Sequence, residues 1–149
     1  IRLGFLGDRT GLPDPVRKAL AEAQAATAAN DKMLLNIAVN YGGRDELVRA
    51  IRKISSMIDK DKLSSTDIDE QLVADCLDTS GKPDPDLIIR PSGESRISNF
   101  LLWQSAYAEL YFTKTLWPDF TKRDLLTALL DYQGRKRRFG KTQEQIAKD

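Results

Sequence analysis

Residues 86–99 read DLIIRPSGESRISN, a stretch that joins a short apolar run to a polar loop. The preceding residues 81–85, GKPDP, cannot continue a helix, so we expect the chain to turn there into a strand over Asp86–Arg90. Two further apolar runs, Leu3–Leu6 and Leu34–Val39, are separated from this one and from each other by longer stretches of helical periodicity. Because strands alternate with helices, the sequence predicts an α/β fold with a largely parallel sheet flanked by helices.

The segments between the apolar runs, and the segment near the end of the chain, predict helices. The first helix begins near Pro13 and ends near Asn30, and the last spans residues 121–132. The second is defined by apolar residues at spacings of four, three and four, which are Leu47, Ile51, Ile54 and Ile58. A third begins near Thr66 and is expected to place Cys76 in the core.

The composition excludes several classes of protein. With 41% hydrophobic and 30% charged residues, the 149-residue chain is expected to pack around an ordinary core. Its formal net charge of +1 gives no bulk attraction for nucleic acid, and no such partner is expected. The single cysteine excludes an intramolecular disulfide and favours a reducing compartment, so we expect a cytoplasmic protein. The absence of histidine excludes Ser-His-Asp and Cys-His catalysis.

The loop after Asp86–Arg90 concentrates side chains that bind anions. In open α/β sheets, ligands bind at the carboxyl ends of the strands. The guanidinium groups of Arg90 and Arg96 can bind phosphate oxygens bidentately, and Gly93 lets backbone N–H groups approach an anion. A diphosphate would suit this set. The residues alone also leave open a capped turn in which the arginines pair with nearby acids such as Glu94.

Three other segments carry weaker signals. Gly42 and Gly43 follow an apolar run, where they fit a tight strand-to-helix turn as well as a phosphate site. Glu109 lies in an aromatic and apolar run and needs a partner, which could be Mg²⁺, an arginine or a cluster of backbone N–H groups. The basic tail over Arg135–Lys141 is a solvated run, a nucleic-acid patch or an arm that reaches an anionic ligand. The nucleic-acid interpretation is disfavoured because no recognised motif accompanies the tail.

Four motifs in this order resemble the cis-prenyltransferase family, namely Asn40–Arg44, Arg90–Phe100, Tyr107–Phe112 and Trp117–Phe120. The resemblance covers the chain from its first residue to about Gly140. It implies the fold of that family and an enzyme that condenses isopentenyl diphosphate onto an allylic prenyl diphosphate with cis geometry. Pyrophosphate would be the leaving group, and the product would be a polyprenyl diphosphate of the undecaprenyl type, a cell-wall precursor.

The resemblance also implies roles for individual residues. The positions that match the site for the diphosphate of isopentenyl diphosphate are Arg90, Arg96, Ile97 and Ser98. Glu109 matches an acidic metal-associated position, which implies Mg²⁺ as the cofactor. Arg138 and Gly140 match an element that reaches across a homodimer to the partner's substrate. Contact with a membrane would be at most peripheral, at product release.

The N-terminal end of the sequence departs from the family pattern. Family members are longer and open with an Asp-Gly-Asn-Gly-Arg loop whose aspartate is catalytic, and this sequence contains no such loop. We therefore expect residues 1–149 to be the C-terminal portion of a single catalytic domain, with the catalytic residue in a missing N-terminal part. The alternative is a non-catalytic diphosphate-binding or accessory subunit of a heteromeric prenyltransferase.

Overall fold

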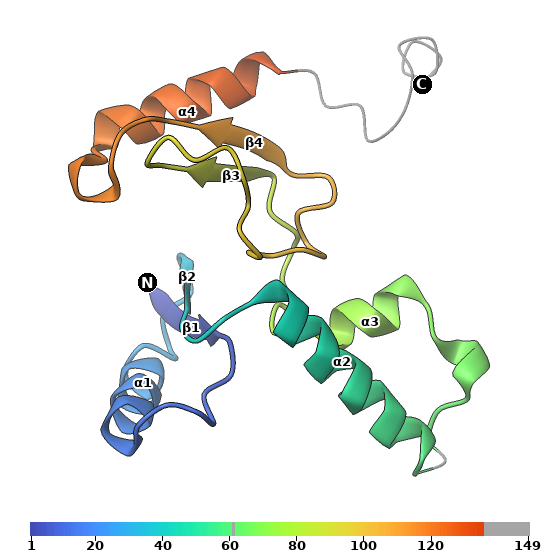
Figure 1. Cartoon of the computed structure of the whole chain (residues 1–149). Helices are drawn as coiled ribbons and strands as arrows, with labels where there is room; N and C mark the ends of the chain where they lie inside the picture. Colours follow the sequence, from blue (N-terminus) through green and yellow to red (C-terminus); the bar gives the residue numbers. More distant parts are fainter. Residues whose placement is uncertain (61, 136–149) are drawn as a thin grey trace, which may run out of the picture. The chain divides into compact units, whose positions relative to one another are not determined.

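The computed structural model describes residues 1–60 and 62–135, which fall into two compact units (Figure 1). The first unit contains residues 1–83 together with Asn99–Leu101. The second contains residues 84–98 and the described residues from Leu102 onward. No helix in the described part of the chain is long and apolar enough to cross a bilayer.

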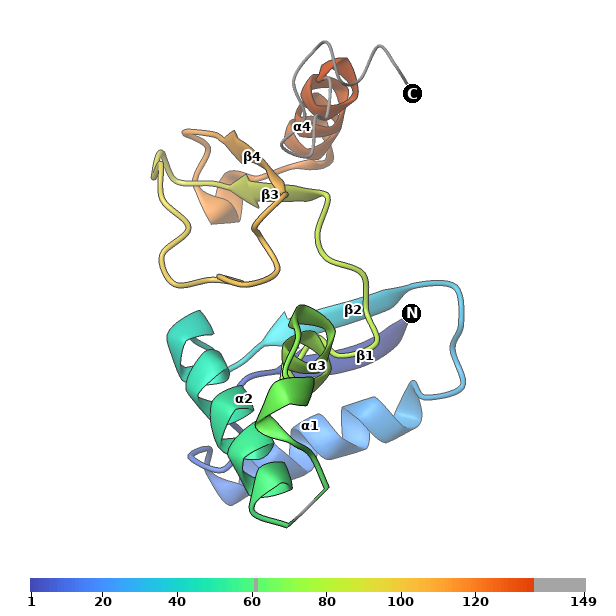
Figure 2. The same cartoon turned by 90° about the vertical axis from the view of Figure 1, so that its right-hand side faces the viewer.

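The first unit is built on two parallel strands, β1 (Arg2–Leu6) and β2 (Leu34–Ala38), which pair along their full lengths. Helix α1 (Asp14–Ala26) joins the two strands and packs against β1 (Figure 2). Pro15 lies in its first turn, where a missing N–H removes no helical hydrogen bond. Strand β2 leaves the side chains of Leu35 and Ile37 more than two-fifths exposed, at 43% and 42%.

Helices α2 (Gly43–Ile58) and α3 (Glu70–Cys76) complete the first unit and pack against each other. A single 3₁₀ turn over Ser65–Asp67 lies between them. The N-terminus of α3 is capped by Asp69, whose carboxylate accepts the backbone N–H of Leu72 at 2.8 Å. This local cap explains where α3 begins.

The second unit contains another parallel pair, β3 (Leu87–Arg90) and β4 (Glu109–Phe112). A 3₁₀ turn over Trp117–Asp119 leads into helix α4 (Lys122–Gly134). Thr121 forms a capping box with Asp124, which lowers the pKa of the Asp124 carboxyl because the ionised form accepts hydrogen bonds from Thr121.

The predicted class of fold is confirmed, since every strand pair in the described residues is parallel and helices flank the strands. Three details differ. Helix α1 ends at Ala26 rather than near Asn30, because the Thr27 hydroxyl bonds back to Ala23 and accepts the N–H of Leu3. Strand β4 was not predicted as a separate strand. Cys76 is only half-buried.

The buried face of α2 also differs from the predicted one. Glu46, Ala50 and Ile54 are buried, whereas Ile51 is 64% exposed. The helix is therefore turned so that a carboxylate, rather than the complete apolar stripe, faces the interior. The hydrogen bonds of Glu46 provide the reason and are described below.

Candidate functional site

Arg90 is the last residue of β3 and begins the loop singled out by its arginines and serines. The Nε atom of its guanidinium is fully buried and has no hydrogen-bond partner among the described residues. A buried donor without a partner is costly, so it requires an explanation, and a bound ion or ligand is one of those that apply. The predicted role of Arg90 in binding an anion stays a prediction.

The next residues, Ser92 and Gly93, extend the strand pairing rather than leaving their backbones open. The N–H of Ser92 donates to the carbonyl of Thr115 at 2.8 Å, and the N–H of Gly93 donates to the carbonyl of Thr113 at 2.8 Å. The N–H groups of Ser92 and Gly93 are therefore already used, and the expectation that Gly93 lets backbone N–H groups approach an anion stays a prediction. Gly93 supplies a left-handed φ of 73° at the turn.

The rest of the loop carries Arg96, Ile97 and Ser98. Arg96 forms an ion pair with Glu94, and the Arg96 side chain remains 67% exposed. An exposed pair of this kind contributes little stability, so the guanidinium can exchange the carboxylate for a stronger anion at small cost. Ile97 is half-buried and Ser98 is exposed. The four predicted diphosphate residues thus lie on one strand end and the loop that continues it.

Left-handed backbone conformations concentrate in and just after this loop. Ser92, Ser98, Asn99 and Leu101 have φ angles of 74°, 48°, 63° and 48°. Each such residue costs about 1–2 kcal/mol when it carries a side chain, and the cost is least for Asn. Conformations of this cost persist where surrounding contacts impose them, and they cluster at functional sites.

Glu109, the predicted metal-associated residue, begins β4 and already has a cationic partner. Its Oε2 accepts a hydrogen bond from Nη1 of Arg135 at 2.8 Å, and Arg135 also bonds to Asp131. The pairing with Glu109 raises the pKa of the Arg135 guanidinium. Of the partners left open by the sequence, the structure places an arginine beside this carboxylate.

A magnesium site requires several oxygen ligands in nearly octahedral array. Across residues 1–60 and 62–135, no group of three or more Asp, Glu, His or Cys side chains could hold a metal ion. The described residues thus supply no preformed cluster of ligands, and Mg²⁺ would have to be held by one or two carboxylates together with waters and substrate phosphates. The predicted role of Glu109 toward a metal stays a prediction, and Arg138 and Gly140 lie outside the described residues.

In the first unit, the residues that follow β1 and β2 are joined to each other by hydrogen bonds. The side chain of Asn40 donates to the carbonyl of Asp8 at 2.8 Å, and the N–H of Asp8 donates to the carbonyl of Asn40 at 3.2 Å. Gly7 has a φ of 111°, and a Cβ there would lie 2.2 Å from the carbonyl oxygen of Val39. Glycine is thus required where β1 ends beside β2.

A buried carboxylate follows these strand ends. Glu46 is 1% exposed, and its Oε2 accepts the hydroxyl proton of Tyr41 at 2.6 Å while its Oε1 accepts the backbone N–H of Asp78 at 2.9 Å. Burial, with this hydrogen bond to Glu46, raises the pKa of the Tyr41 hydroxyl. The sequence analysis missed Glu46, although its spacing of four residues from Ala50 and eight from Ile54 places it on their face of the helix.

Asp78 extends this polar network to the end of β1. Nη1 and Nη2 of Arg49 donate to its two carboxylate oxygens at 2.7 and 2.8 Å, and the N–H of Gly7 donates to Oδ2 at 2.8 Å. The Arg49 guanidinium lowers the pKa of the Asp78 carboxyl, outweighing the opposite effect of partial burial. The first unit thus uses its polar groups to hold its own turns.

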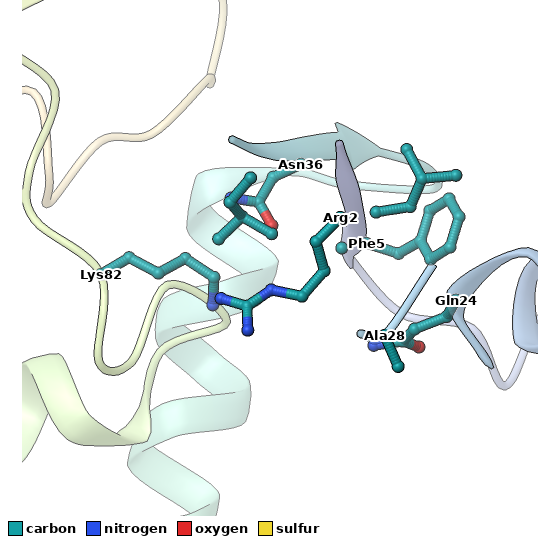
Figure 3. A pocket seen from close by; sticks show the side chains of 9 residues that line it. Arg2, Phe5, Gln24, Ala28, Asn36 and Lys82 are labelled. Atoms are coloured by element: carbon teal, nitrogen blue, oxygen red, sulfur yellow. The ribbon is translucent and has the colours of Figure 1, made fainter. Parts of the chain in front are cut away.

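A hollow of about 390 Å³ lies along β1 in the first unit (Figure 3). Its labelled side chains include Arg2 and Lys82, whose charged ends point toward one another, and Asn36, whose buried Oδ1 has no partner among the described residues. A Cβ at Gly4 would lie 2.1 Å from that oxygen. None of the residues predicted to bind a diphosphate lines this hollow.

The parallel strands and the arginine-bearing loop after β3 define an α/β protein whose candidate site is suited to a phosphate-bearing ligand. The chain belongs to the family described as putative undecaprenyl diphosphate synthase, whose sequence profile matches residues 1–140.

Individual relatives agree with this assignment. An isoprenyl transferase of Chlamydia trachomatis serovar D is 52% identical over 141 residues, covering 95% of this chain and 56% of the relative. A ditrans,polycis-undecaprenyl-diphosphate synthase of Pseudomonas aeruginosa, named as specific for (2E,6E)-farnesyl diphosphate, is 49% identical over 146 residues, covering 98% of this chain and 58% of the relative. The chain thus spans little more than half the length of these curated relatives.

Solved structures share the fold. Lavandulyl diphosphate synthase from Lavandula x intermedia, in complex with dimethylallyl diphosphate, matches with a TM-score of 0.91 and 42% identity, covering 94% of this chain and 60% of that one. A probable undecaprenyl diphosphate synthase from Campylobacter jejuni matches with a TM-score of 0.80 and 38% identity, covering 94% and 63%.

Proposed function

We propose that this chain acts as part of an isoprenyl transferase that condenses isopentenyl diphosphate onto an allylic prenyl diphosphate with cis geometry. The product would be a polyprenyl diphosphate of the undecaprenyl type, a precursor of the lipid carrier used in cell-wall synthesis. The observation that carries the proposal is Arg90, whose buried Nε at the end of β3 lacks a partner within residues 1–60 and 62–135 of this family member. A neighbour crystallised with dimethylallyl diphosphate supports the class of ligand.

The loop residues would bind and orient isopentenyl diphosphate. Arg90 and Arg96 would donate hydrogen bonds to the diphosphate oxygens, and the Ser98 hydroxyl would add another. With the diphosphate held, the double bond of isopentenyl diphosphate is presented to C1 of the allylic substrate. A C–C bond forms as the C1–O bond breaks, pyrophosphate leaves with the electron pair, and loss of a proton from isopentenyl C2 restores a double bond.

The metal cofactor, the cellular compartment and the oligomeric state are also part of this proposal. The whole protein is expected to depend on Mg²⁺ and to operate in the cytoplasm, with at most peripheral membrane contact. A homodimer is supported by apolar side chains that the second unit leaves uncovered, since Trp117 is 71% exposed and Leu130 on α4 is 68% exposed. Arg138 and Gly140 would then reach the substrate of the partner subunit.

Titration calorimetry with the 149-residue chain tests the diphosphate site directly. We expect isopentenyl diphosphate to bind more tightly than isopentenyl monophosphate, because only the diphosphate can engage both arginines. A longer polypeptide that contains this chain should incorporate labelled isopentenyl diphosphate into a polyprenyl product. Absence of binding to the chain, together with absence of condensation by the longer polypeptide, would overturn the proposal.

The second candidate function is a non-catalytic accessory subunit of a heteromeric prenyltransferase, which would use the same arginine-bearing loop after β3. Such a subunit would bind diphosphate and associate with a longer homologous chain that supplies the remaining catalytic groups. Affinity purification from the native source separates the two, since the accessory role requires the longer chain to be recovered in stoichiometric amounts. Recovery without that chain would exclude it.

A further inference from the structure

The segment Asn99–Leu101 directly follows the candidate loop and packs within the first unit. The carbonyl oxygen of Asn99 accepts the N–H of Gly43 at 2.7 Å, and its side-chain Oδ1 accepts the N–H of Arg44 at 2.9 Å. These donors belong to the first turn of α2, whose N-terminal N–H groups have no partner inside the helix. Asn99 therefore caps α2 although it lies 55 residues away from Arg44 in the sequence.

The two residues after Asn99 attach to Tyr41, which precedes the same helix. The ring of Phe100 meets the ring of Tyr41 edge-on, with centroids 5.7 Å apart. A backbone hydrogen bond from Leu101 reaches the Tyr41 hydroxyl, which is itself held by Glu46. All three residues of the segment are thus fixed to the turn that leads into α2.

Gly42 provides the space that Asn99 occupies. A Cβ at this position would lie 2.8 Å from Nδ2 and 3.8 Å from Cγ of Asn99, and no other described residue beyond the neighbouring residues comes within 4 Å. The φ angle of Gly42 is −151°, an extended conformation that any residue adopts. A larger residue here would therefore have to displace the Asn99 side-chain amide, whereas the backbone itself accepts any residue.

We propose that Asn99 is a positioning residue that anchors the end of the diphosphate-binding loop to the Tyr41–Arg44 turn, an inference that rests on the proposed function. Ser98, the last predicted diphosphate residue, is covalently joined to Asn99, so the anchor limits the conformations open to it. Gly42 and Gly43 then serve this anchor. They do not form a phosphate cradle of their own, because the N–H groups of Gly43 and Arg44 already donate to Asn99.

Two substitutions of Asn99 separate the contribution of its side-chain cap from that of its left-handed backbone. Asn99→Gly keeps the left-handed backbone but removes the side-chain cap, whereas Asn99→Asp keeps an acceptor at the helix N-terminus. For Asn99→Gly we expect amide hydrogen exchange at Arg44 and across residues 94–98 to rise about tenfold, and the Kd for isopentenyl diphosphate to rise about fivefold. Asn99→Asp should restore both quantities to within about twofold of the wild-type values.

Gly42→Ala tests the same anchor without altering the loop. The added methyl group should displace the Asn99 side chain and reproduce the effects of Asn99→Gly. In an Asn99→Gly background the methyl group meets nothing, so Gly42→Ala should then have no further effect on exchange or on the Kd. Additive effects of the two substitutions would overturn the proposed coupling.

Asp69→Gly supplies a matched control, because it removes the cap of another helix in the first unit. If it raises exchange at residues 94–98 and the Kd as much as Asn99→Gly, general destabilisation explains the data and the positioning role is wrong. If Asn99→Gly affects only Gly43 and Arg44, Asn99 merely caps α2 and the positioning role is again wrong. If the wild-type chain binds no diphosphate, the proposed function fails, while the exchange data still decide whether the anchor exists.

Discussion

Polar residues follow a strand in both units, but the two sets use their hydrogen-bonding capacity differently. In the first unit, Glu46 and Asp78 each have both carboxylate oxygens bound to donors of the same unit. In the second unit, Arg90 keeps a buried nitrogen without a partner among the described residues, and Arg96 has only an exposed ion pair.

The comparison teaches that a glycine-bearing turn after a strand does not by itself mark a ligand site. The first unit uses its carboxylates for internal support, which lowers the free energy of the fold. The loop of the second unit instead leaves cationic groups available, at some cost in stability. Substitutions of the supporting carboxylates in the first unit should therefore lower the free energy of unfolding. Substitutions of the loop arginines in the second unit should instead weaken ligand binding.

Glu46→Ala is expected to have the largest effect. It leaves the Tyr41 hydroxyl and the Asp78 N–H without their acceptor in the interior, which should lower the free energy of unfolding by about 3 kcal/mol. Urea unfolding followed by circular dichroism measures this change. Glu46→Gln, which keeps an acceptor oxygen, should lose less, and a loss below about 1 kcal/mol for Glu46→Ala would contradict the supporting role of this carboxylate.

Asp78→Asn should cost about 2 kcal/mol near pH 7, because it removes the charge that pairs bidentately with Arg49. The folded pKa of Asp78 is lowered, so its contribution is present above the unfolded pKa of about 3.9 and is lost as pH falls through the folded value. The stability difference between wild type and variant should therefore shrink from pH 5 downward. A difference that stays constant between pH 7 and pH 3 would show that ionised Asp78 contributes nothing.

Arg90→Met should act in the opposite sense on the second unit. It removes a buried donor that has no partner in the described part of the chain, while it keeps the volume of the aliphatic stem, so the free energy of unfolding should stay level or rise. The Kd for isopentenyl diphosphate should increase about tenfold, equivalent to about 1.4 kcal/mol. If Arg90→Met lowers the free energy of unfolding and leaves the Kd unchanged, Arg90 supports the fold and does not bind the ligand. The proposed contrast between the two units would then be wrong.

Glu109→Gln should have the smallest effect. The Glu109 and Arg135 side chains are 29% and 30% exposed, so their ion pair is expected to contribute less than about 1 kcal/mol. A double-mutant cycle with Arg135→Met, read by thermal unfolding, measures the pairwise energy. A coupling of several kcal/mol would instead place Glu109 among the supporting carboxylates.

Local sequence signals were enough to predict the class of fold, the starts of the first and last helices and the loop after β3, whereas α3 begins at Glu70 and not near Thr66. Non-local pairs could not be predicted in this way. The contact between Glu46 and Asp78 joins residues 32 positions apart, and the Arg135 contact with Glu109 joins residues 26 apart. Strand β4 has only four residues, too few for periodicity to distinguish it from the apolar run that contains it. The buried face of α2 was mispredicted because a carboxylate with two partners can replace an apolar side chain.

Strand β2 is paired only with β1 among the described residues, and its Leu35 and Ile37 are exposed. An uncovered apolar strand with a free edge is a template for self-association. Expression of this chain alone should therefore be limited by aggregation during synthesis and refolding, in a manner that depends on protein concentration. Low temperature and dilute refolding, rather than stronger reducing conditions, are the conditions that should improve the recovery of native protein.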